Sequence, residues 1–205
     1  DTETWLQAIE IWGLEITLNK IVGMYSFALW DRKSEALYLV RDRFGEKPLY
    51  YGWLTRNESF VFSSDLIFDK LFKDEEFSIN GDAVNDLLHL NYINNNHSIY
   101  KNIFKIQPGS YSKIIFKKNK NPIINYKKYW EPEKININKN NFSYDENINY
   151  LDNKLTSIVK GQISADVEVG TFLSGGIDSS LITAKAQELS SKKIKTFCIG
   201  NEDKS

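Results

Sequence analysis

The early part of the chain combines a helical with an alternating pattern of apolar residues. From Thr2 to about Ile21 the apolar spacing suits a helix that ends at Gly13 and a second short helix after it. The runs that follow alternate with period two and are rich in aromatic side chains, which is typical of strands. Strands are predicted as a hairpin between Met24 and Arg41 and as a pair in residues 49–54 and 59–64. Together they favour an antiparallel sheet.

Helical spacing returns after these strands and gives way to strand again. The segments "SDLIFDKLF" and "NGDAVNDLLHLNYI" predict helices. Their N-caps are expected at Ser64 or Asp65 and at Asn80 or Asp82. "FKIQPGSYSKIIF" predicts strand with Pro108-Gly109 as its turn. The next stretch is rich in Asn and Lys and poor in large apolar residues, so we expect a linker or long surface connection centred on residues 131–143.

The last part of the chain has the pattern of a parallel α/β unit. A helix from about Tyr144 to Gln162 leads to the strand "VEVGTFL", the turn "SGGIDS", the helix "SLITAKAQELS" and the strand "IKTFCIG". This order of elements builds parallel sheets. The predicted fold class is therefore α+β followed by α/β. We expect an antiparallel domain in residues 1–132, a linker in 133–143 and the start of a parallel domain in 144–205.

Composition and charge exclude several kinds of partner. The 205 residues, 41% of them hydrophobic, are enough for a sizeable core and one or two domains. The formal net charge of -1 attracts neither nucleic acid nor an acidic membrane, and no apolar run approaches the roughly 20 residues of a spanning helix. The single cysteine, Cys198, cannot form an internal disulfide, so we expect the cytoplasm. In the predicted strand "KTFCI" it should be a small buried hydrophobe rather than a nucleophile.

The turn in "FLSGGIDSS" is tight and polar, and it follows a predicted strand. Ligands of α/β sheets bind at the carboxyl ends of strands, where helix N-termini offer unpaired N–H groups. Gly175 and Gly176 allow positive φ and close approach to an anion, while the hydroxyls of Ser174 and Ser179 add donors. Asp178 is either a plain N-cap or a ligand for Mg²⁺ carried by a nucleotide. The turn has no Walker A lysine and is not a dinucleotide fingerprint, and the simpler interpretation is a glycine turn with an Asp cap.

Two segments resemble known families. "FLSGGIDSS" resembles the PP-loop of the ATP pyrophosphatase superfamily, and "GMYSFALWDRKSEALYLVRDRFGEKPLYYGW" resembles the second half of a class II glutamine amidotransferase domain. In this order they resemble the glutamine-hydrolysing asparagine synthetase family. The resemblance implies the C-terminal part of an Ntn-type αββα glutaminase domain, followed by the first part of a parallel α/β PP-loop domain of the adenine nucleotide alpha hydrolase-like type.

The resemblance also implies substrates, cofactors and site residues. In the family, glutamine is hydrolysed at one site, and the ammonia attacks an aspartyl adenylate that the second site makes from aspartate and ATP with Mg²⁺. The matching positions imply that Asp1 holds the α-amino group of glutamine and that Leu173 and Ile199 contact adenosine. Asp178 would also bind Mg²⁺. The implied pyrophosphate loop is Ser174, Gly175, Gly176, Ile177, Asp178 and Ser179. A homodimer is compatible with this interpretation.

Departures from the family pattern limit what this chain should do alone. Residue 1 is Asp where the family's mature chain begins with a cysteine nucleophile, and the chain stops before the later synthetase motifs. We therefore expect an internal piece of a longer protein that catalyses neither half-reaction by itself. Relatives on the same scaffold that use another carboxylate are an alternative: β-lactam synthetases, peptide cyclases and sugar-acid amidotransferases. A second alternative, of a different class, is a non-catalytic nucleotide-binding module.

The run Arg41-Asp42-Arg43 before Gly45 has two interpretations. The first is an ion-paired turn that locks two strand pairs together. The second is a role where the two domains meet and ammonia passes without escaping to water. The sequence favours the first.

Overall fold

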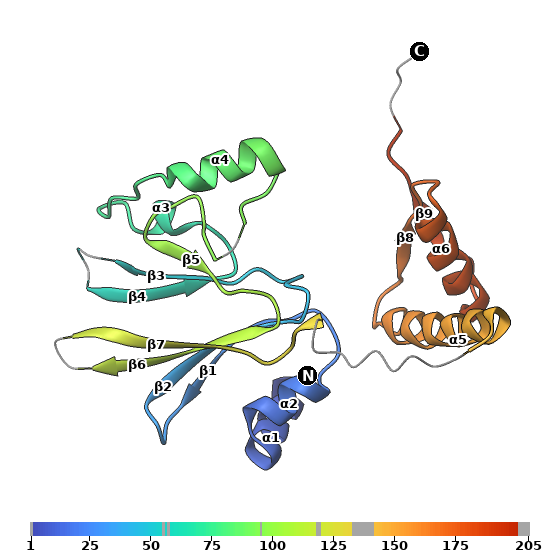
Figure 1. Ribbon diagram of the computed structural model, residues 1–205, viewed down its shortest axis with the longest axis horizontal. Helices are drawn as coiled ribbons and strands as arrows, with labels where there is room; N and C mark the ends of the chain where they lie inside the picture. The colour runs from blue at the N-terminus through green and yellow to red at the C-terminus, as the bar shows by residue number, and fades with distance from the viewer. Residues whose placement is uncertain are drawn as a thin grey trace. The chain divides into compact units, whose positions relative to one another are not determined.

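The computed structural model describes residues 2–54, 56, 58–94, 96–117, 120–132 and 142–200. The chain divides into two compact units, residues 1–136 and 137–205 (Figure 1). The described strands of the first unit pair antiparallel, whereas those of the second pair parallel.

Two helices open the first unit, as the sequence predicts. α1 (Thr2–Trp12) and α2 (Leu14–Lys20) are separated by Gly13, whose φ of 81° lies in the left-handed region. Glycine adopts this conformation without strain, so one helix can end and the next begin around a single residue. The Gly13 amide donates to the Ile9 carbonyl, and the Gly13 carbonyl accepts the first bond of α2 from Thr17.

The first unit contains two antiparallel sheets rather than the single sheet that its early strands suggest. The larger has the order β1-β2-β6-β7, with strands Ser26–Asp31, Ala36–Arg41, Ser110–Lys117 and Lys120–Lys128. The smaller has the order β4-β3-β5, with strands Ser59–Ser63, Tyr50–Leu54 and Ile103–Lys105. Each early hairpin gains a later strand, and the two sheets cover each other's apolar faces.

Two apolar clusters show how the larger sheet is covered. On one face Leu37 and Leu39 of β2 belong to a buried cluster against which Tyr51 and Phe60 of the smaller sheet pack. On the other face Val40 belongs to a cluster that includes Leu18 of α2 and the Trp5 ring of α1. Side chains of β2 thus alternate between two cores, which explains why this strand is buried almost throughout.

The remaining helices of the first unit are α3 (Phe68–Leu71) and α4 (Gly81–Leu90). In Figure 1 they lie on the side of the smaller sheet that faces away from the larger one. The layers of this unit are therefore helix, sheet, sheet and helix. This is the predicted layer order, and its assignment as Ntn-type stays a prediction.

The helix starts in this region test the predicted N-caps. Asn80 caps α4, as one of the two predicted residues, by accepting a bond from the Asp82 amide. Ser64 and Asp65 do not cap α3, whose N-cap is Ile67. The reason is local, because the Asp65 carboxylate accepts from the Leu66 amide next to it at 2.7 Å, and the helix starts later.

The sequence does not predict β7, which lies in the Asn- and Lys-rich stretch. It pairs along its length with β6, from Ser110 opposite Lys128 onward. β7 is an edge strand of the larger sheet. An edge strand has a hydrogen-bonding partner on one side only and needs less apolar cover than a central strand. Pro122 within it is typical of such an edge. Of the predicted linker, residues 133–141 lie outside the described residues.

The second unit has the predicted order of helix, strand, helix and strand. These elements are α5 (Tyr144–Gln162), β8 (Gly170–Phe172), α6 (Ile177–Leu189) and β9 (Lys195–Phe197). β8 and β9 pair parallel, with Thr171 opposite Thr196. Val159 of α5 and Ala186 of α6 are the buried apolar residues of this unit in the described part of the chain. No helix among the described residues is long and apolar enough to cross a membrane.

Candidate functional site

The segment between β8 and α6 is a short exposed loop, residues 173–176. Gly175 has a φ of 82° and so needs the left-handed conformation that favours glycine. Gly176 has a φ of −74° and a ψ of 162° and is the N-cap of α6. The prediction that both glycines use positive φ is therefore right for Gly175 and wrong for Gly176, which has the extended backbone of an ordinary N-cap.

Two serine hydroxyls close this loop. The Oγ atoms of Ser174 and Ser179 lie 3.0 Å apart, and the Ser179 hydroxyl donates to the Gly176 carbonyl at 3.1 Å. Because a hydroxyl has one hydrogen, Ser174 is then the donor to Ser179. No side chain caps α6, so its first N–H groups keep their hydrogen-bonding capacity and the partial positive charge of a helix start. The arrangement can bind an anion.

Asp178 is the second residue of α6 and is exposed. It is not the N-cap, because Gly176 has that position, so the interpretation of Asp178 as a plain cap is wrong. None of the ion pairs among the described residues uses Asp178. Nor do those residues contain a group of three or more His, Cys, Asp or Glu that could hold a metal ion. Among the described residues, Asp178 is the exposed carboxylate that the loop region offers to a metal ion.

The two residues predicted to contact adenosine lie at neighbouring strand ends. Leu173 extends the strand pair by one bond, since its amide donates to the Phe197 carbonyl at 2.9 Å. Ile199 follows the end of β9 and is 94% exposed. Both therefore lie at the carboxyl ends of parallel strands, on the same side as the loop. Asp1, the predicted glutamine ligand, lies outside the described residues.

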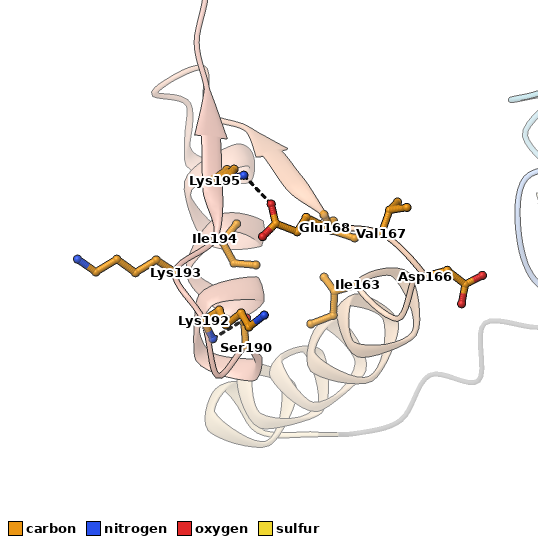
Figure 2. A pocket seen from close by; sticks show the side chains of 10 residues that line it. Ile163, Asp166, Val167, Glu168, Ser190, Lys192, Lys193, Ile194 and Lys195 are labelled. Atoms are coloured by element: carbon orange, nitrogen blue, oxygen red, sulfur yellow. Dashed lines mark hydrogen bonds and ion pairs between the residues drawn. The ribbon is translucent and has the colours of Figure 1, made fainter.

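A hollow of about 370 Å³ lies at the opposite ends of the same strands (Figure 2). It is lined by Ile163, residues 166–169, Ser190 and residues 192–195. The ammonium of Lys195 binds the carboxylate of Glu168 at 2.5 Å, while the Lys193 side chain points away from the hollow. No loop residue lines it. Because ligands of parallel sheets bind at carboxyl ends, the exposed loop is the stronger candidate and the hollow receives no function.

Arg41 in the first unit donates to three backbone carbonyls. Its Nε donates to Lys47 at 2.8 Å, its Nη1 to Ile106 at 2.8 Å and its Nη2 to Gly45 at 2.5 Å. Ile106 follows the last strand of the smaller sheet, so Arg41 ties the end of β2 to that sheet. The turn does lock the strand pairs together, as the first interpretation has it. It does so through hydrogen bonds to backbone carbonyls rather than through an ion pair. The described salt bridges include none between Arg41 and Asp42.

Asp42 organises the same turn from the inside. Its side chain accepts bonds from four backbone amides, those of Tyr25, Phe44, Glu46 and Lys47, at 3.0 to 3.3 Å. The residue is 1% exposed. Desolvation by burial alone would raise the pKa of Asp42, but the four N–H donors outweigh it, so the pKa lies below its ordinary value.

Cys198 is exposed, so the prediction that it is buried is wrong. β9 ends one residue earlier, and β8 is its single neighbour among the described strands. Nothing described covers its other edge.

Comparison with known families agrees with both parts of the chain. The glutamine amidotransferase domain family matches residues 1–130, and the asparagine synthase family matches residues 150–205. The chain belongs to the glutamine-hydrolysing asparagine synthetase family. As a member of this family, it contains an amidotransferase domain and an asparagine synthase domain of mixed α and β structure.

Curated relatives of this asparagine synthetase family member match it along its whole length. A candidate glutamine-hydrolysing asparagine synthetase of Methanocaldococcus jannaschii is 36% identical over 210 residues, which is 100% of this chain and 38% of the relative. The glutamine-hydrolysing asparagine synthetase 1 of Bacillus subtilis is 30% identical over 202 residues, 98% of this chain and 30% of the relative. Amidase chyE of Penicillium rubens is 27% identical over 209 residues, which is 100% of this chain and 29% of the relative. The chain thus spans less than two-fifths of the length of these relatives.

Proposed function

We propose that the chain is part of an ATP- and glutamine-dependent asparagine synthetase. The whole protein would convert aspartate to asparagine through β-aspartyl-AMP and release AMP and pyrophosphate. The observation that carries the proposal is the exposed glycine and serine loop at the uncapped start of α6, in a segment that matches the asparagine synthase family. Residues 1–132 and 144–205 are the proposed domains, and 133–143 the proposed linker.

The loop suits a reaction in which pyrophosphate leaves. Aspartate's side-chain carboxylate is a poor electrophile, and adenylation supplies a good leaving group. N–H donors that are already oriented, from the loop and from the start of α6, would stabilise the charge that develops on that group. The proposed pyrophosphate contacts are those of residues 174–179, and Leu173 and Ile199 would lie on the adenosine side.

Asp178 fits a magnesium ligand by its chemistry and its place. Mg²⁺ usually binds through one or two carboxylates together with substrate phosphates and water. The exposed carboxylate of Asp178 beside the anion loop offers one such oxygen ligand. When bound, Mg²⁺ would neutralise phosphate charge during the displacement.

The first unit would supply ammonia from glutamine. Asp1 is the proposed ligand of the substrate's α-amino group. The one cysteine of this sequence belongs to the second unit, so the glutaminase nucleophile is not in this chain. The cytoplasmic location and the homodimer stay predictions.

A second candidate uses the same site with another acceptor acid. The observation in its favour is the match along the whole chain to a protein named an amidase. The anion loop activates a carboxylate in either case, so it does not separate the two candidates.

The deciding experiment uses the full-length protein with Mg·ATP, aspartate and glutamine. We expect AMP and pyrophosphate to form, with formation dependent on aspartate. AMP that forms only with a different acid would establish the second candidate. ADP, or no turnover with any acid, would overturn the proposal and leave a nucleotide-binding module.

A second experiment places the nucleotide. Cys198 follows Phe197, whose carbonyl binds Leu173 at the start of the loop. Mg·ATP is therefore expected to slow the alkylation of Cys198 by iodoacetamide, whereas free adenine should not protect to the same extent. Equal alkylation rates with and without Mg·ATP would argue against the proposed adenosine position.

A further inference from the structure

Beyond Leu173, whose amide binds the Phe197 carbonyl, the loop between β8 and α6 is exposed. A Cβ atom on Gly175 would meet no atom within 4 Å, and Ile177 is 87% exposed. The bond between Ser174 and Ser179 lies within the loop and the first helical turn, so it closes the loop without attaching it to anything else. The position of the loop must therefore come from the elements that flank it.

Each flanking element is held by a neighbour of its own kind. β8 lies so close to β9 that a Cβ on Gly170 would be 2.6 Å from the Phe197 ring and 3.0 Å from the Lys195 carbonyl. α6 is attached to α5 by Lys185, whose ammonium lies 2.8 Å from the Asp152 carboxylate. These contacts hold strand to strand and helix to helix. They do not fix the strand relative to the helix.

One described hydrogen bond joins β8 directly to α6, whereas Gln187 near the end of α6 binds only the connection that leads into β9. The Thr183 hydroxyl donates to the Thr171 hydroxyl at 3.1 Å, and both residues are half-buried. Thr171 lies on β8 just before the loop, and Thr183 lies in the second turn of α6. Both side chains are β-branched and restricted at χ1, so the two hydroxyls meet only at a narrow range of strand and helix positions.

We propose that Thr171 and Thr183 are positioning residues for the anion loop. Their bond sets the distance and rotation between the end of β8 and the start of α6, and so directs the loop N–H groups toward the phosphates. This inference rests on the proposed nucleotide-binding function. It goes beyond it by assigning a role to two residues that touch no part of the nucleotide.

The test measures binding to the full-length protein rather than stability alone. Thr183→Val removes the hydroxyl and keeps the branched shape. We expect the dissociation constants of Mg·ATP and of inorganic pyrophosphate to rise about fivefold, the size of one ordinary hydrogen bond, while that of adenosine stays unchanged. Thr183→Ser keeps a hydroxyl and should restore most of the affinity.

Two further variants separate positioning from general weakening. Thr156→Val removes a half-buried hydroxyl from α5, a helix that contributes neither residue of the strand-to-helix bond, and should leave all three dissociation constants unchanged. In the double variant Thr171→Val with Thr183→Val, the second change should add no further loss, because the bond is already broken.

The outcomes keep the two proposals apart. Wild-type protein that binds neither Mg·ATP nor pyrophosphate would overturn the proposed function. Wild-type binding with the same dissociation constants in Thr183→Val would overturn the positioning role alone. A lower melting temperature in Thr183→Val with unchanged affinity would also overturn it, since the bond would then serve stability only.

Discussion

At the scale of single residues, Gly175 is the position of the proposed site whose backbone conformation most restricts the side chain. Its φ of 82° would strain Gly175→Ala by about 1 to 2 kcal/mol. No atom lies within 4 Å of an added Cβ at this position, so the substitution is expected to change the conformation of the exposed loop rather than to unfold the unit. We expect the dissociation constant of pyrophosphate to rise about tenfold, as measured by isothermal titration calorimetry.

Gly161→Ala is the matched control for this prediction. Gly161 lies near the end of α5 without positive φ and with no atom within 4 Å of an added Cβ. Alanine is the better helix former, so this variant should raise the free energy of unfolding by about 0.5 kcal/mol and leave the affinity unchanged. A Gly175→Ala variant with wild-type affinity would show that the left-handed conformation is not needed for binding.

Asp42 makes the stability of the first unit dependent on acid. Its pKa is lower in the folded chain than its ordinary value of about 3.9, so its stabilisation is complete above that value and is lost as the pH falls through the folded pKa. Asp42→Asn replaces an acceptor of four amides with a group that also carries donors. At pH 7 we expect a loss of about 2 to 3 kcal/mol in the free energy of unfolding.

The pH dependence distinguishes the charge of Asp42 from its shape. As the pH falls from about 4 through the lower folded pKa of Asp42, the difference in free energy of unfolding between wild type and Asp42→Asn should shrink, because the wild-type carboxylate takes up a proton over that range. Urea unfolding at several pH values, followed by tryptophan fluorescence, measures it. A difference that stays constant with pH would mean that the ionised carboxylate is not what stabilises the turn.

At the scale of elements, α5 begins with a capping box that can be tested alone. The Ser143 side chain accepts from the Glu146 amide at 3.3 Å, and the Glu146 carboxylate accepts from the Ser143 amide at 2.8 Å. Ser143→Ala should lower the free energy of unfolding of the second unit by about 1 kcal/mol. Ser157→Ala, in the exposed interior of the same helix, should not lower it. Urea unfolding followed by circular dichroism compares the two variants. Equal losses in the free energy of unfolding would show that the capping box does not stabilise the helix.

The same scale shows what the sequence could predict. α5 was predictable over its full length, because its apolar spacing is helical and Ser143 precedes it. β7 was not, since an edge strand can be built from a polar sequence when a neighbour supplies its hydrogen bonds. The pairing of hairpins into two sheets depends on strands far along the chain. Local periodicity carries no information about such partners.

The candidate site was predictable to a different degree. Residues 174–179 are consecutive, so one motif could place them all in one turn. Which glycine takes positive φ, and that Asp178 lies inside the helix rather than at its cap, depend on backbone geometry that the motif leaves open. The bond from Thr171 to Thr183 joins a strand to a helix, and no sequence pattern indicates it.

At the scale of the whole molecule, Arg41 separates a structural role from one in ammonia transfer. Its guanidinium supplies donors to three carbonyls, so Arg41→Ala should lower the free energy of unfolding by about 3 kcal/mol. In the full-length protein we expect the ratio of glutamine hydrolysed to product formed to stay as in wild type. Parallel assays of glutamate and AMP measure that ratio. An excess of glutamate would favour the interpretation of Arg41 as a residue of the ammonia route.

The distribution of two residue types over the units has an optical consequence. Trp5, Trp12, Trp30, Trp53 and Trp130 all belong to the first unit, whereas the one cysteine, exposed Cys198, belongs to the second. An acceptor dye on that thiol would receive tryptophan excitation energy from the first unit alone. The unaltered sequence therefore carries donors in one unit and an attachment point in the other, and energy transfer would report any change in their separation when substrates bind.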